Sequence, residues 1–116
     1  MTERRRILLV EDEPMIAFAL EDIVSDLGYE VVGPAHRLAD ALVLAANQEL
    51  DGAILDVNLN EVSSFPVADL LKERGIPFMF ATGYAEGGVD WTGEVVVIAK
   101  PYGRDQLAQA LASLFA

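Results

Sequence analysis

The fold is decided by residues 7–14, which read ILLVEDEP. Four consecutive apolar residues are typical of a strand that is buried on both faces of a parallel sheet. The proline suits the first position of a helix, and three acids, Glu11, Asp12 and Glu13, stand between the strand and that helix. The stretch therefore predicts the start of an α/β fold with charged groups at the carboxyl end of its first strand.

Four further apolar runs predict strands at residues 31–32, 53–55, 78–81 and 95–99. Segments with apolar residues at helical spacing separate the first four strands and follow the last one. These helical stripes run through Ile16, Leu20, Ile23, Val24 and Leu27, through Leu38, Leu42 and Ala45, through Val67, Leu70 and Leu71, and through Leu107, Leu111 and Leu114. With right-handed crossovers, this alternation predicts a doubly wound, five-stranded parallel sheet of flavodoxin-like order 2-1-3-4-5.

Glycines mark the ends of the first and third helices and interrupt the segment where a fourth helix would lie. Gly28 and Gly75 suit the stops of the first and third helices. Residues 82–94, between the fourth and fifth strands, contain four glycines and no sustained apolar stripe. We therefore expect the fourth helix to be short, frayed or absent. With 116 residues, the chain has the length of one compact domain, residues 1–116.

Composition excludes several classes of function. There is no cysteine, which removes disulfides and cysteine-ligated metals. Eight basic residues against 19 acidic ones give a net charge of −11, which repels nucleic acid and anionic membranes. The apolar runs are too short for a membrane span, and the N-terminus lacks the apolar segment of a signal peptide. We expect a cytoplasmic protein.

Carboxylates are predicted to meet at the carboxyl edge of the sheet. Strand one leads into Glu11 and Asp12, strand three ends in Asp56, and these strands are neighbours in the expected order. Two unit charges about 4 Å apart repel by about 4 kcal/mol at an effective dielectric near 20. Since all the candidate ligands are oxygens, the cluster favours a hard divalent cation, Mg²⁺ or Mn²⁺ as its substitute.

The ends of strands four and five add a hydroxyl, on Thr82, and an ammonium, on Lys100. A carboxylate, a cation, a hydroxyl and an ammonium together suit phosphoryl transfer. In this interpretation Asp56 is the nucleophile and becomes an acyl phosphate, whose charge Lys100 and the cation stabilise.

Four motifs in the right order resemble the receiver (CheY-like) domains of two-component response regulators: residues 7–13 (ILLVEDE), 54–59 (ILDVNL), 81–83 (ATG) and 100–101 (KP). The resemblance covers essentially the whole chain. It implies phosphorylation of Asp56, Mg²⁺ binding by Asp12 and Asp56, a water-mediated contact from Glu11 and a backbone carbonyl ligand from Asn58. It also implies phosphoryl-oxygen contacts from Thr82 and Lys100. The family implies a sensor histidine kinase as partner, with phosphohistidine as the immediate donor.

Residues 77–84, PFMFATGY, resemble the FAT GUY branch of receivers, which are single-domain regulators associated with HWE-type histidine kinases. Two departures from the general receiver pattern agree with that branch: Asn60 replaces a proline, and Val97 replaces the switch aromatic. We hypothesise that the glycine-rich segment 82–94 is the mobile output, with Tyr84 or Tyr102 in the role of the aromatic residue. For Tyr102, simple packing on the sheet edge is an equal alternative.

Other functions remain as alternatives. A hydrolase that passes through an aspartyl phosphate usually needs a second acid two residues after its nucleophile, where this chain has Asn58. A nucleotide or flavin site needs a phosphate cradle after strand one, where this chain has acids. An interaction module that is never phosphorylated is a third alternative. For a signalling phosphoacceptor, the output is a downstream protein, a homodimer or a role as phosphate sink.

Two isolated residues carry no function in this interpretation. His36, the only histidine, is expected in a loop after strand two, on the far side of the site, and not as a phosphate carrier. Trp91 lies in the glycine-rich segment and is expected to fold back on its own domain.

Overall fold

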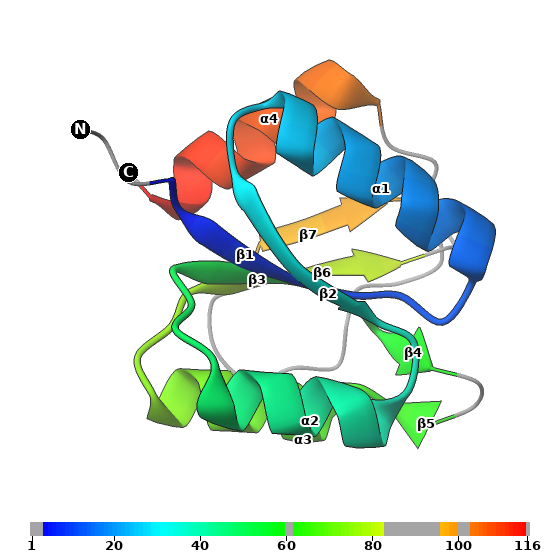
Figure 1. The fold of residues 1–116 in the computed structure, drawn as a ribbon, viewed down its shortest axis with the longest axis vertical. Helices are drawn as coiled ribbons and strands as arrows, with labels where there is room; N and C mark the ends of the chain where they lie inside the picture. Colours follow the sequence, from blue (N-terminus) through cyan, green and yellow to red (C-terminus); the bar gives the residue numbers. More distant parts are fainter. Residues whose placement is uncertain (1–3, 60–61, 83–95, 100–102, 116) are drawn as a thin grey trace.

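A five-stranded parallel sheet forms the centre of the molecule in the computed structural model, which describes residues 4–59, 62–82, 96–99 and 103–115 (Figure 1). Its strand order is β2-β1-β3-β6-β7, which confirms the predicted order 2-1-3-4-5. These strands are β1 (Arg6–Val10), β2 (Glu30–Ala35), β3 (Gly52–Asp56), β6 (Phe78–Thr82) and β7 (Val96–Ala99). Since all four neighbouring pairs are parallel, every strand delivers its carboxyl end to the same edge.

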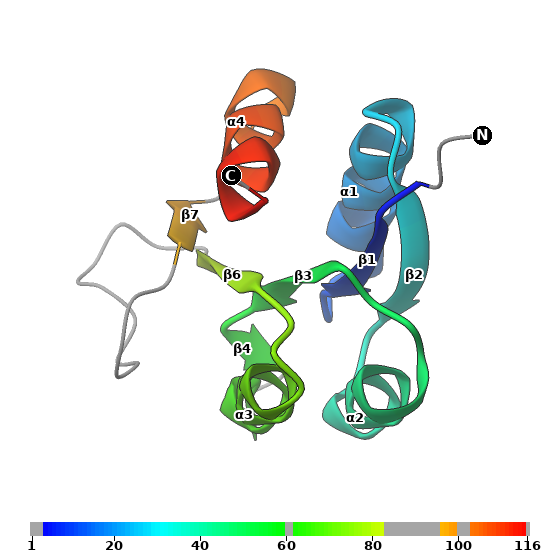
Figure 2. The ribbon, with the colours of Figure 1, turned by 90° about the vertical axis from the view of Figure 1, so that its left-hand side faces the viewer.

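Helices cover both faces of this sheet. They are α1 (Pro14–Asp26), α2 (Leu38–Asn47), α3 (Phe65–Glu73) and α4 (Arg104–Leu114). Figure 2 shows α1 and α4 on one face and α2 and α3 on the other. None of the helices in the described ranges is long and apolar enough to cross a bilayer.

The core consists of two clusters, one on each face of the sheet. Strand β1 contributes to both, because Ile7 and Leu9 pack toward α1 and α4 while Leu8 and Val10 pack toward α2 and α3. All four side chains are at most 1% exposed. The first apolar run is therefore a strand buried on both faces, as its sequence predicts.

The helix ends follow the predicted signals. Helix α1 begins at Pro14, and Gly28 lies two residues beyond its last residue with a φ of 99°. Helix α3 follows Ser64 and ends before Gly75, whose φ is 74°. The positive φ angles explain why glycine stands at both stops, since a side chain would strain the left-handed backbone there.

Two features differ from the predictions. An antiparallel hairpin of two short strands, β4 (Asn58–Leu59) and β5 (Val62–Ser63), follows β3, and two-residue strands are too short to show periodicity in a sequence. Strand β2 is also longer than expected, because it continues through Gly33 and Pro34. The prediction of a short, frayed or absent fourth helix concerns residues 82–94, and all of them except Thr82, the last residue of β6, lie outside the described part of the chain.

Candidate functional site

Three carboxylates meet where β1 and β3 end. Glu11 and Asp12 follow β1, Asp56 is the last residue of β3, and Val10 pairs with Leu55 between these strands. One carboxylate oxygen from each of the three acids lies within 4.8 Å of the other two. Glu11 and Asp56 are only 2% and 7% exposed, whereas Asp12 is half-buried. The sheet thus brings together the three acids that the sequence places at this edge.

This donor set fits a hard divalent cation. Like charges at such separations repel by several kcal/mol at an effective dielectric near 20, and a bound cation reverses the sign of that interaction. Mg²⁺ prefers oxygen ligands and usually takes one or two carboxylates together with water and phosphate oxygens. Glu11, Asp12 and Asp56 are the residues that would hold it, and its chemistry would be to offset negative charge at the site.

Hydrogen bonds fix the loop that carries two of the acids. The Glu13 backbone N–H donates to the Glu11 carboxylate at 3.1 Å, which ties that side chain to the start of α1. The Glu11 backbone N–H donates to the carbonyl oxygen of Ala35 at 3.0 Å. The Glu11 carbonyl oxygen lies 2.9 Å from Nδ1 of His36. Glu11 is therefore held by α1 on one side and by the end of β2 on the other.

His36 does not lie on the far side of the site, so the prediction of its place is wrong. Its ring contacts the backbone of Glu11, the residue next to Asp12. The physical reason is that β2 and β1 are parallel neighbours, so the residues that follow them meet at the same edge. The parallel topology expected from the sequence contains this signal, since it places the residue after β2 beside the residue after β1.

The segment after Asp56 is fixed to the neighbouring strand and to α3. The Val57 N–H donates to the Ala81 carbonyl at 3.1 Å, and the Val57 carbonyl accepts from the Ser64 N–H at 3.0 Å. Asn58, the predicted carbonyl ligand, begins β4 and is exposed. Thr82, the last residue of β6, is half-buried and lies one position beyond Ala81, the partner of Asp56. Asn58 and Thr82 therefore both lie at the acidic edge.

The remaining predicted site residues are Lys100, Tyr84 and Tyr102, and all three lie outside the described residues. Strand β7 ends at Ala99, which pairs with Thr82. The described part of β7 therefore ends at the acidic edge, and Lys100 is the next residue of the chain. Val97, which stands at the position of the switch aromatic, is 43% exposed on β7.

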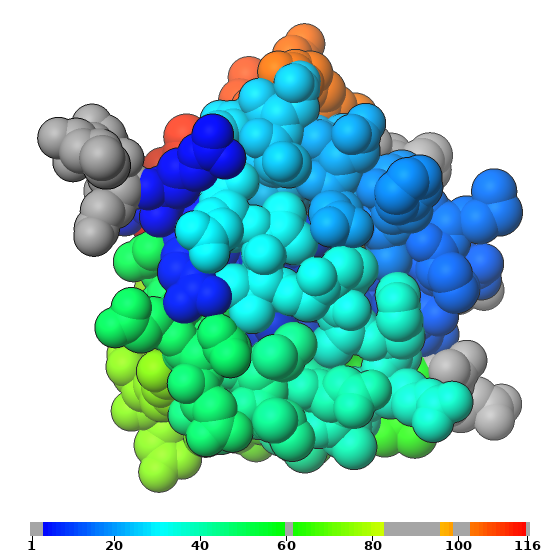
Figure 3. Space-filling model, in the orientation of Figure 1, coloured from blue at the N-terminus to red at the C-terminus, as the bar shows by residue number. Residues whose placement is uncertain are grey.

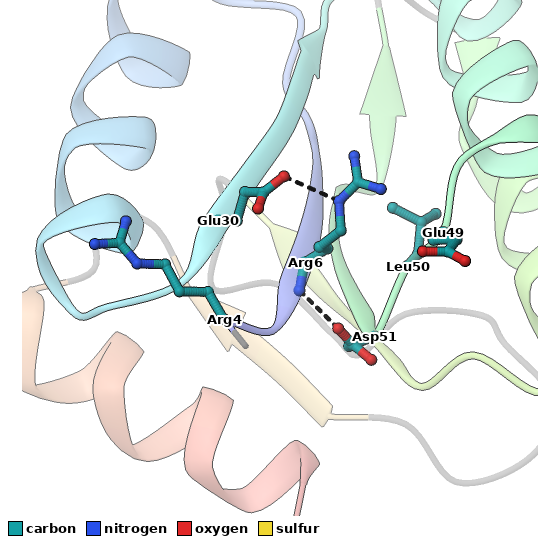
Figure 4. A pocket seen from close by; sticks show the side chains of 6 residues that line it. All are labelled: Arg4, Arg6, Glu30, Glu49, Leu50 and Asp51. Atoms are coloured by element: carbon teal, nitrogen blue, oxygen red, sulfur yellow. Dashed lines mark hydrogen bonds and ion pairs between the residues drawn. The ribbon is translucent and has the colours of Figure 1, made fainter. Parts of the chain in front are cut away.

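A pocket at the opposite edge of the sheet is lined by Arg4, Arg6, Glu30, Glu49, Leu50 and Asp51 (Figure 4). Two of its acidic residues contact Arg6. The Arg6 Nε lies 3.1 Å from a Glu30 carboxylate oxygen, and the Arg6 backbone N–H donates to the Asp51 carboxylate at 2.8 Å. These contacts join the starts of β1, β2 and β3, so the pocket is explained as a structural junction.

Comparison with known proteins identifies the family. The response regulator receiver domain model matches residues 7–112. The chain is 41% identical to the phyllosphere-induced regulator PhyR of Methylorubrum extorquens over 103 residues, which are 83% of this chain and 38% of PhyR. The chain thus spans well under two thirds of this longer relative.

Two solved structures resemble the whole chain. The solution structure of SdrG from Sphingomonas melonis Fr1 has 43% identity and a TM-score of 0.87, and the match covers 100% of both chains. The BeF3-activated conformation of SdrG from Pseudomonas melonis Fr1 has 40% identity and a TM-score of 0.76, again over 100% of both chains. The family model, the fold and these relatives together show that the chain belongs to the response-regulator receiver family of two-component signalling.

Proposed function

We propose that residues 1–116 form one receiver domain that accepts a phosphoryl group on Asp56 from a sensor histidine kinase, in a reaction that depends on Mg²⁺. The observation that carries this proposal is the meeting of Glu11, Asp12 and Asp56 within 4.8 Å at the carboxyl edge of a receiver fold. Mn²⁺ would substitute, because it shares the preference of Mg²⁺ for oxygen ligands.

In the proposed reaction a carboxylate oxygen of Asp56 attacks the phosphorus of phosphohistidine. The new O–P bond forms as the P–N bond breaks, and the departing imidazole nitrogen keeps the electron pair and takes a proton. The product is an acyl phosphate on Asp56. Attack of water on its phosphorus would return the carboxylate and release phosphate, so the domain turns over only its own phosphoryl group.

The surrounding residues would hold and orient the reacting groups. Asp12 and Asp56 would hold the cation directly, Glu11 would hold it through water, and Asn58 would offer its backbone carbonyl, as the resemblance to receivers implies. Thr82 and Lys100 donate to the phosphoryl oxygens, with Lys100 supplying a fixed positive charge. The Val57 backbone supports this arrangement, since both of its polar groups are hydrogen-bonded to neighbouring segments.

The surface beside the acidic loop suits the approach of a protein donor. Helix α1 leaves this loop with Met15 81% and Phe18 74% exposed, three residues apart on one face. In the space-filling view the start of α1 (blue) projects at the surface on the side of the sheet's carboxyl edge (Figure 3). We assign these two side chains to the contact with the kinase, because a donor must reach Asp56 from this edge.

The proposed partner and output rest on the resemblance of residues 77–84 to the FAT GUY receivers. We propose that the donor is an HWE-type histidine kinase and that the transfer takes place in the cytoplasm. We propose no nucleic acid as a partner of the domain. Tyr84 or Tyr102 would pass the change on, to a downstream protein or a second copy of the chain, unless the domain serves as a phosphate sink. The similarity to BeF3-activated SdrG supports a second, activated conformation, since BeF3 mimics a phosphoryl group.

Mass spectrometry with a small donor tests the proposal. Incubated with phosphoramidate and Mg²⁺, the wild type should gain the mass of one phosphoryl group, and chelation of the metal should prevent the gain. Asp56→Asn should gain nothing. Asp69→Asn, which changes an exposed aspartate on α3, is the matched control and should behave as the wild type. An Asp56→Asn protein that still gains the mass would refute the assignment.

A further inference from the structure

We propose that His36 is a positioning residue for the acidic site, because its imidazole fixes the backbone of Glu11 and with it the loop that carries Asp12. The inference rests on the proposed function. It adds to the site a residue that directly follows β2 and is not one of the three acids.

The first observation is the contact itself. Nδ1 of His36 lies 2.9 Å from the carbonyl oxygen of Glu11. A carbonyl oxygen only accepts hydrogen bonds, so Nδ1 carries the proton and donates it. The neighbouring residue, Ala35, accepts the Glu11 N–H at 3.0 Å. Two consecutive residues at the end of β2 thus satisfy both backbone polar groups of Glu11.

The second observation is that β2 has an irregularity that brings these two residues into place. Between Leu8 and Val10 of β1, the partner changes from Val32 to Ala35, so β2 advances by three residues while β1 advances by two. Such an extra residue is a β-bulge, a device that re-aims the side chains beyond it. Without it, the register would place Pro34, which has no N–H, opposite Val10.

Gly33 makes the bulge possible. Its φ is 96°, and a Cβ at this position would lie 2.8 Å from the Ala35 nitrogen and 3.1 Å from the Leu9 carbonyl oxygen. Only glycine fits this close approach without strain. The sequence from Gly33 to His36 therefore forms a unit that clamps Glu11.

The third observation is what the clamp holds. On the other side of Glu11, its carboxylate accepts from the Glu13 N–H at 3.1 Å, so the whole turn from β1 to α1 is fixed at both ends. Asp12 lies in the middle of this turn, and its carboxylate must stay within 4.8 Å of those of Glu11 and Asp56. Groups that orient metal ligands without touching the metal typically contribute 10- to 100-fold to affinity. For a hydrogen bond to the ligand's backbone we expect about fivefold.

The experiment compares four proteins: wild type, His36→Leu, His36→Asn and Asn47→Ala. In His36→Asn the side-chain amide nitrogen can take the place of Nδ1. Asn47→Ala is the matched control, because it also removes a side-chain donor to a carbonyl, that of Val43 at 2.9 Å, but on α2 away from the acids. Mg²⁺ affinity is measured by isothermal titration calorimetry, and amide hydrogen exchange at Glu13 by nuclear magnetic resonance without Mg²⁺.

We expect His36→Leu to weaken Mg²⁺ binding about fivefold and to speed exchange of the Glu13 amide. His36→Asn should keep most of the wild-type Mg²⁺ affinity and most of the slow exchange of the Glu13 amide, and Asn47→Ala should change neither quantity. The inference is overturned if His36→Leu matches the wild type in affinity and exchange, or if Asn47→Ala loses as much as His36→Leu. A wild type that binds no Mg²⁺ would refute the proposed function instead, and the exchange comparison would still decide the role of His36.

Discussion

Asp12 is the half-buried member of a cluster whose other two carboxylates are almost fully buried. Its place in the loop explains both its chemistry and its predictability. An acid directly after a buried strand must lie at the sheet's edge, so the sequence was sufficient to bring Glu11, Asp12 and Asp56 together. The same topology places His36 at this edge, but its contact with the Glu11 backbone depends on the extra residue in β2, which no periodicity reveals.

Removing one negative charge from this cluster should weaken the binding of the cation. We expect Asp12→Asn to lower Mg²⁺ affinity by at least about tenfold, because the amide keeps the shape of the side chain but loses a charged ligand. Calorimetric titration measures the change, with Asp69→Asn as the control for an aspartate away from the site. Equal affinities of Asp12→Asn and wild type would mean that this carboxylate is not a ligand.

Helix α1 carries both buried and exposed apolar residues. Leu20 and Val24 of the predicted stripe are buried, and so is Ala17, which was not part of that stripe. The prediction is wrong for Ile16, which is 39% exposed, and Met15 and Phe18 are more exposed still. A sequence pattern of apolar residues shows which positions could pack on a core but does not show which face the sheet covers. The hairpin of β4 and β5 was likewise not predictable, since each strand has two residues.

Loss of the exposed ring of Phe18 should affect transfer from a protein but not from a small molecule. We expect Phe18→Ser to slow phosphotransfer from a histidine kinase by about 5- to 30-fold, the usual range for an aromatic contact of 1–2 kcal/mol. Phosphorylation by phosphoramidate should keep its rate, and the free energy of unfolding should change by less than about 0.5 kcal/mol.

Val43→Ser is the matched control for this contact. Val43 is 59% exposed on α2, on the opposite face of the sheet from α1. Its substitution should leave both rates unchanged. If Phe18→Ser slowed the small donor as much as the kinase, α1 would act on the site itself and not on the docking of the donor.

The whole molecule is stabilised by two apolar clusters that the central sheet separates. Phe80, on β6, is fully buried in one of them, and its ring packs against Phe65 and Phe78 at centroid distances of 5.4 and 5.5 Å. Strand order and layers were predictable from the sequence, because five buried runs alternate with helical stripes. What depends on longer-range packing, such as the full length of β2, was not.

We expect Phe80→Ala to lower the free energy of unfolding by about 3–5 kcal/mol, because it leaves a cavity beside the rings of Phe65 and Phe78. That loss is a large share of the 5–15 kcal/mol that is typical of a domain, as an order of magnitude. Phe18→Ala, the same change at a 74% exposed position, should cost far less. Urea denaturation measures both, and equal losses would contradict the packing described for Phe80.

The most direct measurement is to locate the phosphoryl group on the chain. After incubation with phosphoramidate and Mg²⁺, borohydride reduction converts a phosphorylated aspartate into homoserine, which peptide mass spectrometry assigns to one position. We expect homoserine at Asp56 alone, and only when both donor and Mg²⁺ are present. A modification at Asp12, or a phosphoryl group on His36, would contradict it.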